Sequence, residues 1–138
     1  MASSVLVDCS FIVALLTDRD GNHVWAAATA RRHPPPWRTC EPVLSEAFHL
    51  LGASGLSPMA ELLISRSLTC DFNAANHIDE ILRLMSKYQD MPMTFADACL
   101  VRMSEVLPDP IVVTSDSDFR IYRRHGRQVV PCVMPRQP

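Results

Sequence analysis

Residues 5–16 read VLVDCSFIVALL, and this stretch defines the fold class of the 138-residue chain. The β-branched run Val5–Val7 predicts a short buried strand, and the apolar block Phe11–Leu16 predicts a buried helix after it. Ser10 is placed to cap that helix. A continuous apolar strand leading into a helix is typical of a parallel sheet that is covered on both faces. Asp8 stands at the junction, directly after the predicted strand.

The alternation of short β-rich runs and helical segments continues along the chain. Further strands are predicted at Trp37–Cys40, Leu68–Phe72, Ile111–Val113 and Gln128–Val133, the last with Pro131 inside it and therefore at a sheet edge. Further helices are predicted at His23–Arg32, 42–51, Met59–Ser67, 75–88, Phe95–Val106 and Phe119–Arg124. The sequence thus predicts an α/β fold: one domain over residues 1–134, with a short, mostly parallel sheet flanked by helices on both faces, and a short tail at 135–138.

Composition excludes several classes of protein. With 48% hydrophobic residues the chain is not wholly disordered, and no apolar run approaches the ~20 residues of a membrane span. Asp8 interrupts the apolar N-terminal stretch, which also lacks the positive start of a signal peptide, so we expect a cytoplasmic protein. The five Cys and five His are scattered without CxxC or HxxxH spacing, which argues for reduced thiols and against a zinc site.

Acidic residues follow two of the predicted strands. Asp8 comes directly after Val5–Val7, and Asp116 and Asp118 follow Ile111–Val113. Ligands of parallel α/β sheets bind beyond the carboxyl ends of the strands, so these acids are candidates for a site. The structural alternative is capping: Asp8 can cap the first helix, and Asp116 or Asp118 can cap the segment that starts near Phe119.

Two further acids lie within apolar helical segments. Glu46 lies at the edge of the predicted apolar face formed by Val43, Leu44, Ala47, Phe48, Leu50 and Leu51. It can point along the core boundary toward a cleft, or outward to solvent or an arginine. Asp97 occupies the last position of a capping box that begins at Thr94, which explains it structurally without excluding a metal-binding role. Oxygen ligands without nearby His or Cys would suit Mg²⁺ or Mn²⁺.

Four segments resemble the successive motifs of a PIN domain, and in particular those of VapC-type toxins of bacterial toxin–antitoxin pairs. They are VLVDCSFIVALL (5–16), EPVLSEAFHLL (41–51), YQDMPMTFADACLVRMSE (88–105) and IVVTSDSDFRIYRR (111–124). The resemblance covers residues 4–133, in the family's motif order. One departure is visible, because many relatives carry an acid where this chain has Thr94.

The resemblance implies a metal-dependent endoribonuclease that hydrolyses RNA phosphodiesters. Asp8, Glu46, Asp97 and Asp116 would form an acidic quartet around Mg²⁺ or Mn²⁺, with Asp118 as an additional ligand or water holder. Such ions activate water for attack on phosphate esters. Ser10 and Thr114 would support the carboxylates through their hydroxyls. The resemblance also implies a small antitoxin as partner, a homodimer and an RNA substrate.

Two other functions of α/β proteins with an Asp at a strand end fit these residues less well. A phosphatase of the DxD type needs an acid two residues after Asp8, where this chain has Ser10. A response-regulator receiver needs a Lys after a late strand, but Lys87 is the sole lysine and lies in a predicted helix. A non-catalytic α/β RNA- or protein-binding module remains an alternative, as does a housekeeping PIN nuclease without an antitoxin.

The arginines Arg120, Arg123 and Arg124 lie close together near the C-terminus, in the segment Phe119–Arg127 (FRIYRRHGR). If this segment is helical to Arg124, Arg120 and Arg124 share one face at i, i+4 spacing. We expect this face to flank the acidic site and to hold RNA phosphates. The alternative is a solvated face that pairs locally with acids.

Overall fold

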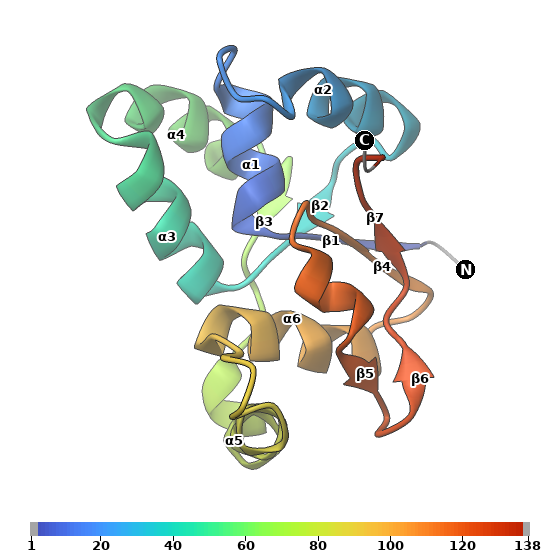
Figure 1. Cartoon of the computed structure of the whole chain (residues 1–138). Coiled ribbons are helices and arrows are strands. Elements are labelled where there is room, and N and C mark those ends of the chain that lie inside the picture. Colours follow the sequence, from blue (N-terminus) through green and yellow to red (C-terminus); the bar gives the residue numbers. More distant parts are fainter. Residues whose placement is uncertain (1–2, 137–138) are drawn as a thin grey trace.

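A five-stranded parallel sheet forms the centre of the computed structural model, which describes residues 3–136 (Figure 1). The strand order is β3-β2-β1-β4-β7, and every neighbouring pair is parallel. The bounds are β1 (Ser4–Val7), β2 (Trp37–Arg38), β3 (Leu68–Thr69), β4 (Pro110–Val113) and β7 (Cys132–Val133). A separate antiparallel pair joins β5 (Arg123–Arg124) to β6 (Gln128–Val129). The predicted α/β fold class is confirmed.

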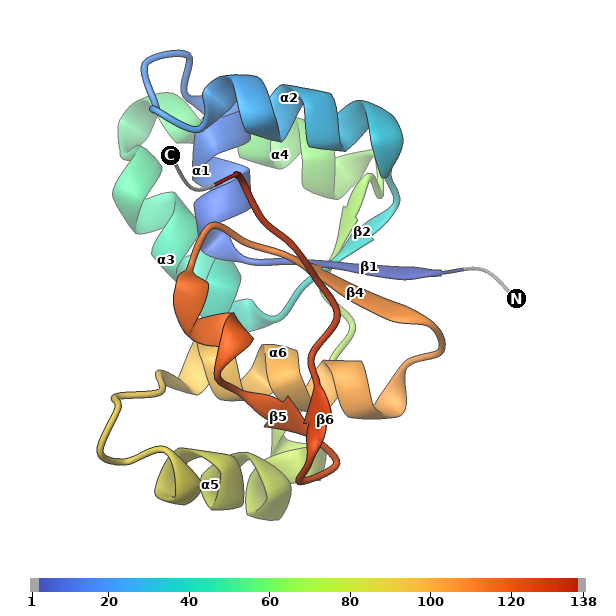
Figure 2. The ribbon, with the colours of Figure 1, turned by 45° about the vertical axis from the view of Figure 1, so that its right-hand side comes forward.

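Helices cover both faces of the sheet. They are α1 (Cys9–Leu16), α2 (His23–Arg32), α3 (Glu41–Leu51), α4 (Leu56–Ile64), α5 (Ile78–Lys87) and α6 (Phe95–Val106), with 3₁₀ segments η1 (Ala53–Gly55), η2 (Ala74–His77) and η3 (Ser117–Arg120). In the two ribbon views, α1, α2 and α4 lie on one side of the sheet and α5 and α6 on the other (Figures 1 and 2). Helix α3 packs against α1 and also touches α6. No helix within residues 3–136 combines the length and apolar character of a membrane span.

Strand β1 is the core of the sheet, because all four of its residues are buried and it pairs with strands on both sides. Leu6 and Val7 are fully buried, and burial of each such side chain contributes about 1.5–3 kcal/mol. Val7 lies opposite Val113 of β4. The chain adds β2 and β3 on one side of β1 and β4 and β7 on the other. The strand order therefore reverses between β1 and β4, where ligands of such sheets bind.

The predicted helix Phe119–Arg124 is wrong. The 3₁₀ segment η3 ends at Arg120, and the chain then turns into the extended strand β5. The N–H of Arg123 donates to the Tyr88 hydroxyl at 2.9 Å instead of to a helical carbonyl. His125 and Gly126, with φ of 51° and 81°, form the turn of the β5–β6 hairpin. A tertiary contact and a left-handed turn thus replace the helix, so Arg120 and Arg124 do not share a helical face.

The predicted strand Gln128–Val133 is divided at Pro131 into β6 and β7. Proline has no N–H to donate, but the carbonyl of Pro131 accepts a hydrogen bond from Val112 at 2.8 Å. The edge position predicted from Pro131 is confirmed, since β7 is the outer strand of the sheet. Elsewhere the helix predicted at Met59–Ser67 lies at Leu56–Ile64, and the strand predicted at Leu68–Phe72 ends at Thr69. Residues 137–138 of the predicted tail lie outside the described residues.

Candidate active site

Asp8 lies where β1 meets α1, at the reversal point of the sheet. It is 7% exposed and caps α1, because its Oδ1 accepts a hydrogen bond from the Cys9 N–H at 2.7 Å. Its Oδ2 accepts from the Thr114 hydroxyl at 2.7 Å and from the Ser10 hydroxyl at 3.4 Å. Of the two residues that the sequence offers as caps of α1, Asp8 is the one observed, and Ser10 lies within the helix. Both oxygens of this carboxylate are held by the protein.

Ser10 and Thr114 join the ends of β1 and β4. Their hydroxyl oxygens lie 3.3 Å apart, and Thr114 is fully buried. The N–H of Ser115 donates to Ser10 Oγ and the N–H of Asp116 donates to Thr114 Oγ1, both at 3.0 Å. This network fixes the loop after β4 to the start of α1. It therefore sets the position of the acids on that loop.

Asp116 and Asp118 lie on this loop and at the start of η3. Asp116 is the cap of η3, since its Oδ1 accepts from the Asp118 N–H at 2.9 Å. The backbone carbonyl of Asp118 accepts from the N–H groups of Ile121 and Tyr122. The capping alternative is thus realised by Asp116. Burial raises the pKa of Tyr122, and the nearby charge of Asp118 contributes to the same shift.

Asp97 lies in the first turn of α6 and completes the predicted capping box. Its N–H donates to Thr94 Oγ1 at 3.0 Å, and its Oδ2 accepts from the Thr94 N–H at 3.4 Å. Oδ2 also accepts from the Tyr122 hydroxyl at 3.1 Å. Both acceptor contacts fall on one oxygen. Tyr122 was not predicted as a site residue, because the predicted helix Phe119–Arg124 placed it only among the arginines.

The charges of three of the acids act on one another. Burial raises the pKa of Asp8 from 3.8 to about 6; the Thr114 hydrogen bond lowers it, while Asp97 and Asp116 raise it. Burial also raises the pKa of Asp97, against the hydrogen bonds from Tyr122 and Thr94, and Asp116 raises it further. None of the three forms an ion pair with a basic residue in the part of the chain that the structure describes. The structure thus brings two buried carboxylates, Asp8 and Asp97, together with the partly buried Asp116 without a protein cation.

The three carboxylates differ in which oxygens the protein holds. Among the described residues, Asp97 Oδ1 and Asp116 Oδ2 have no protein hydrogen-bond donor, whereas both oxygens of Asp8 are occupied. Within residues 3–136, no three His, Cys, Asp or Glu side chains are arranged as a ready-made metal site. The donor chemistry, oxygen-only and uncompensated in charge, still fits a hard divalent cation.

Glu46 does not join this group in the structure. It is exposed on α3, next to an apolar face that is narrower than predicted, since Leu50 is 58% exposed. Its charge contributes to raising the pKa of Cys9, at the start of α1, to about 12, after the larger effect of burial. Glu46 therefore lies near the first turn of α1. Its carboxylate makes no hydrogen bond or ion pair with other described residues.

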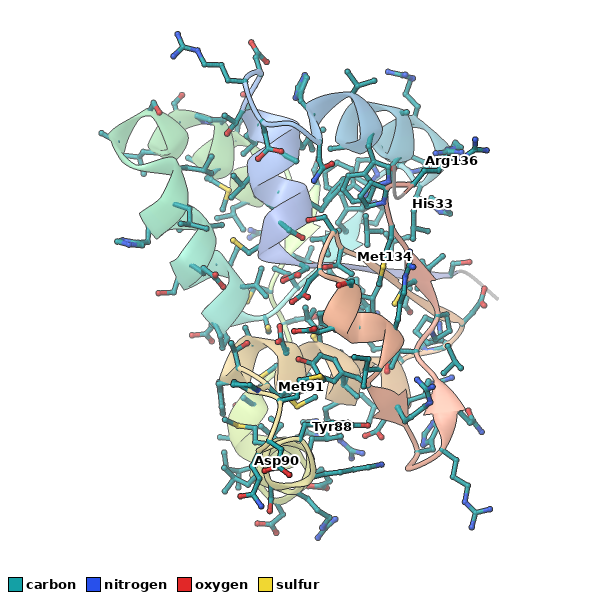
Figure 3. The ribbon with its side chains drawn as sticks, in the orientation of Figure 1. His33, Tyr88, Asp90, Met91, Met134 and Arg136 are labelled. Atoms are coloured by element: carbon teal, nitrogen blue, oxygen red, sulfur yellow. The ribbon has the colours of Figure 1, made fainter. Side chains whose placement is uncertain are left out.

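The arginines near the C-terminus are bonded mostly to backbone. Arg123 donates to the carbonyls of Arg120, Ile121 and Tyr122 at 2.7–3.2 Å. Arg124 donates to a carbonyl of α6, and Arg120 donates through Nε to the sulfur of Met134 at 3.2 Å. In the side-chain view Met134 lies well away from Tyr88, which is near the end of α5 (Figure 3).

This fold and site define a class: an α/β protein whose acids gather where the strand order of a parallel sheet reverses. A comparison with family models matches the PIN domain over residues 5–124, and the chain therefore belongs to the PIN domain family. The crystal structure of VapC20 of Mycobacterium tuberculosis, described as a toxin that cleaves the sarcin–ricin loop, is similar to this chain. The TM-score is 0.70 at 22% identity, covering 83% of this chain and 92% of that one. The search of curated proteins found no match.

Proposed function

We propose that this chain is a Mg²⁺- or Mn²⁺-dependent endoribonuclease that hydrolyses RNA phosphodiesters. The observation that carries the proposal is the convergence of Asp8, Asp97 and Asp116 at the carboxyl ends of β1 and β4 without a basic partner. Like charges buried together are unfavourable unless a cation offsets them. Membership of the PIN domain family supports the same chemistry.

The residues divide into holding and positioning roles. Asp8, Asp97 and Asp116 would hold the ion, with Asp118 as a further ligand or water holder and Glu46, exposed near the first turn of α1, as a water holder only. A bound divalent ion supplies an activated water and neutralises charge that develops on the phosphate. The hydroxyls of Ser10 and Thr114 orient Asp8 and fix the loop that carries Asp116.

RNA binding is proposed for the arginines at the end of η3 and in β5. Arg120 is exposed, whereas Arg123 and Arg124 use their guanidinium groups on backbone carbonyls. Arg120 would therefore contact a phosphate directly, while Arg123 and Arg124 would contribute positive charge and maintain the hairpin. Single-stranded RNA is the expected substrate, because its backbone can bend into a narrow site.

We further propose that the nuclease is the toxin of a type II toxin–antitoxin pair, acting in the cytoplasm as a homodimer. The similarity of fold to VapC20 supports this assignment. A small antitoxin would cover the acids with an Arg or Lys and lay a helix in an apolar groove. A short neighbouring reading frame that encodes a DNA-binding fold would favour this role over that of a housekeeping nuclease.

Cleavage of a fluorescent single-stranded RNA with Mn²⁺ tests the enzymatic proposal. Wild type should cleave, and Asp8→Asn and Asp116→Asn should lose at least about 100-fold in rate, since each removes charge from the ion's site. Asp90→Asn changes an exposed acid of the α5–α6 loop, labelled in Figure 3, and should retain the wild-type rate. Cleavage that is equal in all variants, or absent from wild type at millimolar Mn²⁺, would favour a non-catalytic binding module.

A further inference from the structure

Tyr122 is buried and its side chain reaches the acidic site. Its side chain has no exposed surface, and its hydroxyl donates to Asp97 Oδ2 at 3.1 Å. A buried hydroxyl without a partner would cost about 1–3 kcal/mol, so this bond fixes where the phenol points. The bond joins a residue of the η3–β5 connection to the first turn of α6.

The same residue also holds the loop that carries Asp116 and Asp118. Its backbone N–H donates to the Asp118 carbonyl at 3.2 Å, while its side chain reaches Asp97. Tyr122 is therefore hydrogen-bonded directly to two segments that carry acids, the first turn of α6 and the loop with Asp116 and Asp118. These segments lie about twenty residues apart in sequence. A shift of its ring would move Asp97 relative to Asp116.

Aromatic neighbours restrict the ring of Tyr122. Phe119 contacts it edge-on at 5.2 Å between ring centroids, and Tyr88 does so at 5.1 Å. The Tyr88 hydroxyl in turn accepts from the Arg123 N–H at 2.9 Å. Rings packed in this way hold the phenol in one orientation. Tyr88 belongs to the same cluster but bonds backbone and not a carboxylate.

The contacts of Asp97 show what this orientation achieves. Tyr122 and the Thr94 N–H both bond Oδ2, and no described residue donates to Oδ1. One oxygen of the carboxylate is thus anchored and the other is left for a ligand. Hydrogen bonds to the anchored oxygen of a metal-binding carboxylate orient it, and their loss typically weakens metal binding 10- to 100-fold.

We infer that Tyr122 is a positioning residue of the metal centre, which anchors Asp97 Oδ2 and thereby presents Asp97 Oδ1 to the cation. This inference rests on the proposed metal-dependent function. It assigns a role to a residue that is neither one of the acids of the proposed metal site nor one of the arginines proposed to bind RNA. Tyr122 acts through Asp97 and does not itself contact RNA or the ion.

The chain offers a matched pair of variants, because Tyr88 and Tyr122 are its two tyrosines. Tyr122→Phe and Tyr88→Phe each remove one hydroxyl from the same aromatic cluster. By calorimetric titration of the full chain with Mn²⁺, Tyr122→Phe should raise the Kd about tenfold, and Tyr88→Phe should stay within about twofold of wild type. In RNA cleavage under subsaturating Mn²⁺, Tyr122→Phe should lower kcat and leave the RNA KM within about twofold.

Wild-type Mn²⁺ affinity in Tyr122→Phe, or an equal loss in both variants, would overturn the positioning role while leaving the metal-dependent function intact. A wild-type chain that binds no Mn²⁺ would overturn both. If Tyr122→Phe fails to fold, the Tyr88→Phe chain provides the test, because Tyr122 is then its sole tyrosine. Mg²⁺ should change its tyrosine absorbance, and adding Asp97→Asn should abolish that change; an unchanged spectrum would overturn the inference.

Discussion

Replacing Asp8 by Asn should make the metal-free protein more stable at neutral pH and less stable at acid pH. The pKa of Asp8 is raised by burial from 3.8 to about 6, so the folded state binds this proton more tightly than the unfolded chain does. The stabilisation from Asp8 is therefore complete below pH 3.8 and is lost as the pH rises through about 6. At 1.36 kcal/mol for each pH unit between the two pKa values, the ionised side chain costs up to about 3 kcal/mol above pH 7.

Asn removes this cost but also loses the acceptor at Oδ2, which takes hydrogen bonds from Thr114 and Ser10. It can still accept from the Cys9 N–H and cap α1 as well as Asp does. Its amide nitrogen cannot accept from the Thr114 hydroxyl, which bonds Asp8 Oδ2 at 2.7 Å, and this costs about 1 kcal/mol. Relative to wild type, the free energy of unfolding of Asp8→Asn should therefore be about 2 kcal/mol higher at pH 8 and about 1 kcal/mol lower at pH 4.

The measurement is urea unfolding of wild type and Asp8→Asn in EDTA at several pH values from 4 to 8. The difference in unfolding free energy between the two chains isolates residue 8, because the other titrating groups occur in both. Asp90→Asn serves as the control and should track wild type throughout, since Asp90 is exposed. A difference that stays constant from pH 4 to pH 8 would refute the raised pKa and with it the electrostatic cost of the site.

Four further outcomes are expected. Thr114→Val should lower the free energy of unfolding by about 1–2 kcal/mol at pH 8 and weaken Mn²⁺ binding, because Asp8 loses its buried donor; urea unfolding and calorimetry measure the two effects. Leu6→Ala should cost about 2–5 kcal/mol in urea unfolding, since Leu6 is fully buried in the central strand. EDTA should abolish RNA cleavage and added Mn²⁺ should restore it, whereas activity that survives EDTA contradicts a metal requirement. Arg120→Gln should weaken RNA binding and flatten its salt dependence without lowering Tm, while Arg124→Gln should lower Tm because it loses a carbonyl partner in α6.

The parts of the fold that the sequence predicted well have strong local signals. The run Val5–Val7 identifies β1, and the helix Phe95–Val106 was predicted with its observed bounds. That helix begins at a capping box and ends before Pro108, so both of its ends are encoded within a few residues. The placement of Asp8 near Asp116 follows from parallel strands whose carboxyl ends share one edge.

The parts that were predicted wrongly depend on distant contacts. The segment after η3 is not a helix because the N–H of Arg123 bonds the hydroxyl of Tyr88, thirty-five residues earlier in the chain. The role of Tyr122 was missed for the same reason, since its partner Asp97 is separated from it by twenty-five residues. For Glu46 the sequence left open a position toward a cleft or toward solvent, and the structure exposes it beside Leu50, which is itself exposed. Periodicity does not report which side of a helix its neighbours leave uncovered.

Capping alone does not account for the acids at this edge of the sheet. Asp8 caps α1 and Asp116 caps η3, yet Asn caps a helix as well as Asp does and carries no charge to bury. At residue 8 the charged form is the costly one, because burial and the neighbouring carboxylates raise its pKa to about 6. A carboxylate held at that cost, with no basic partner within residues 3–136, gains its advantage only when a cation is present. The free-energy cost of ionising the buried Asp8 therefore distinguishes a metal centre from a set of helix caps. The pH dependence of the difference in unfolding free energy between wild type and Asp8→Asn measures this cost directly.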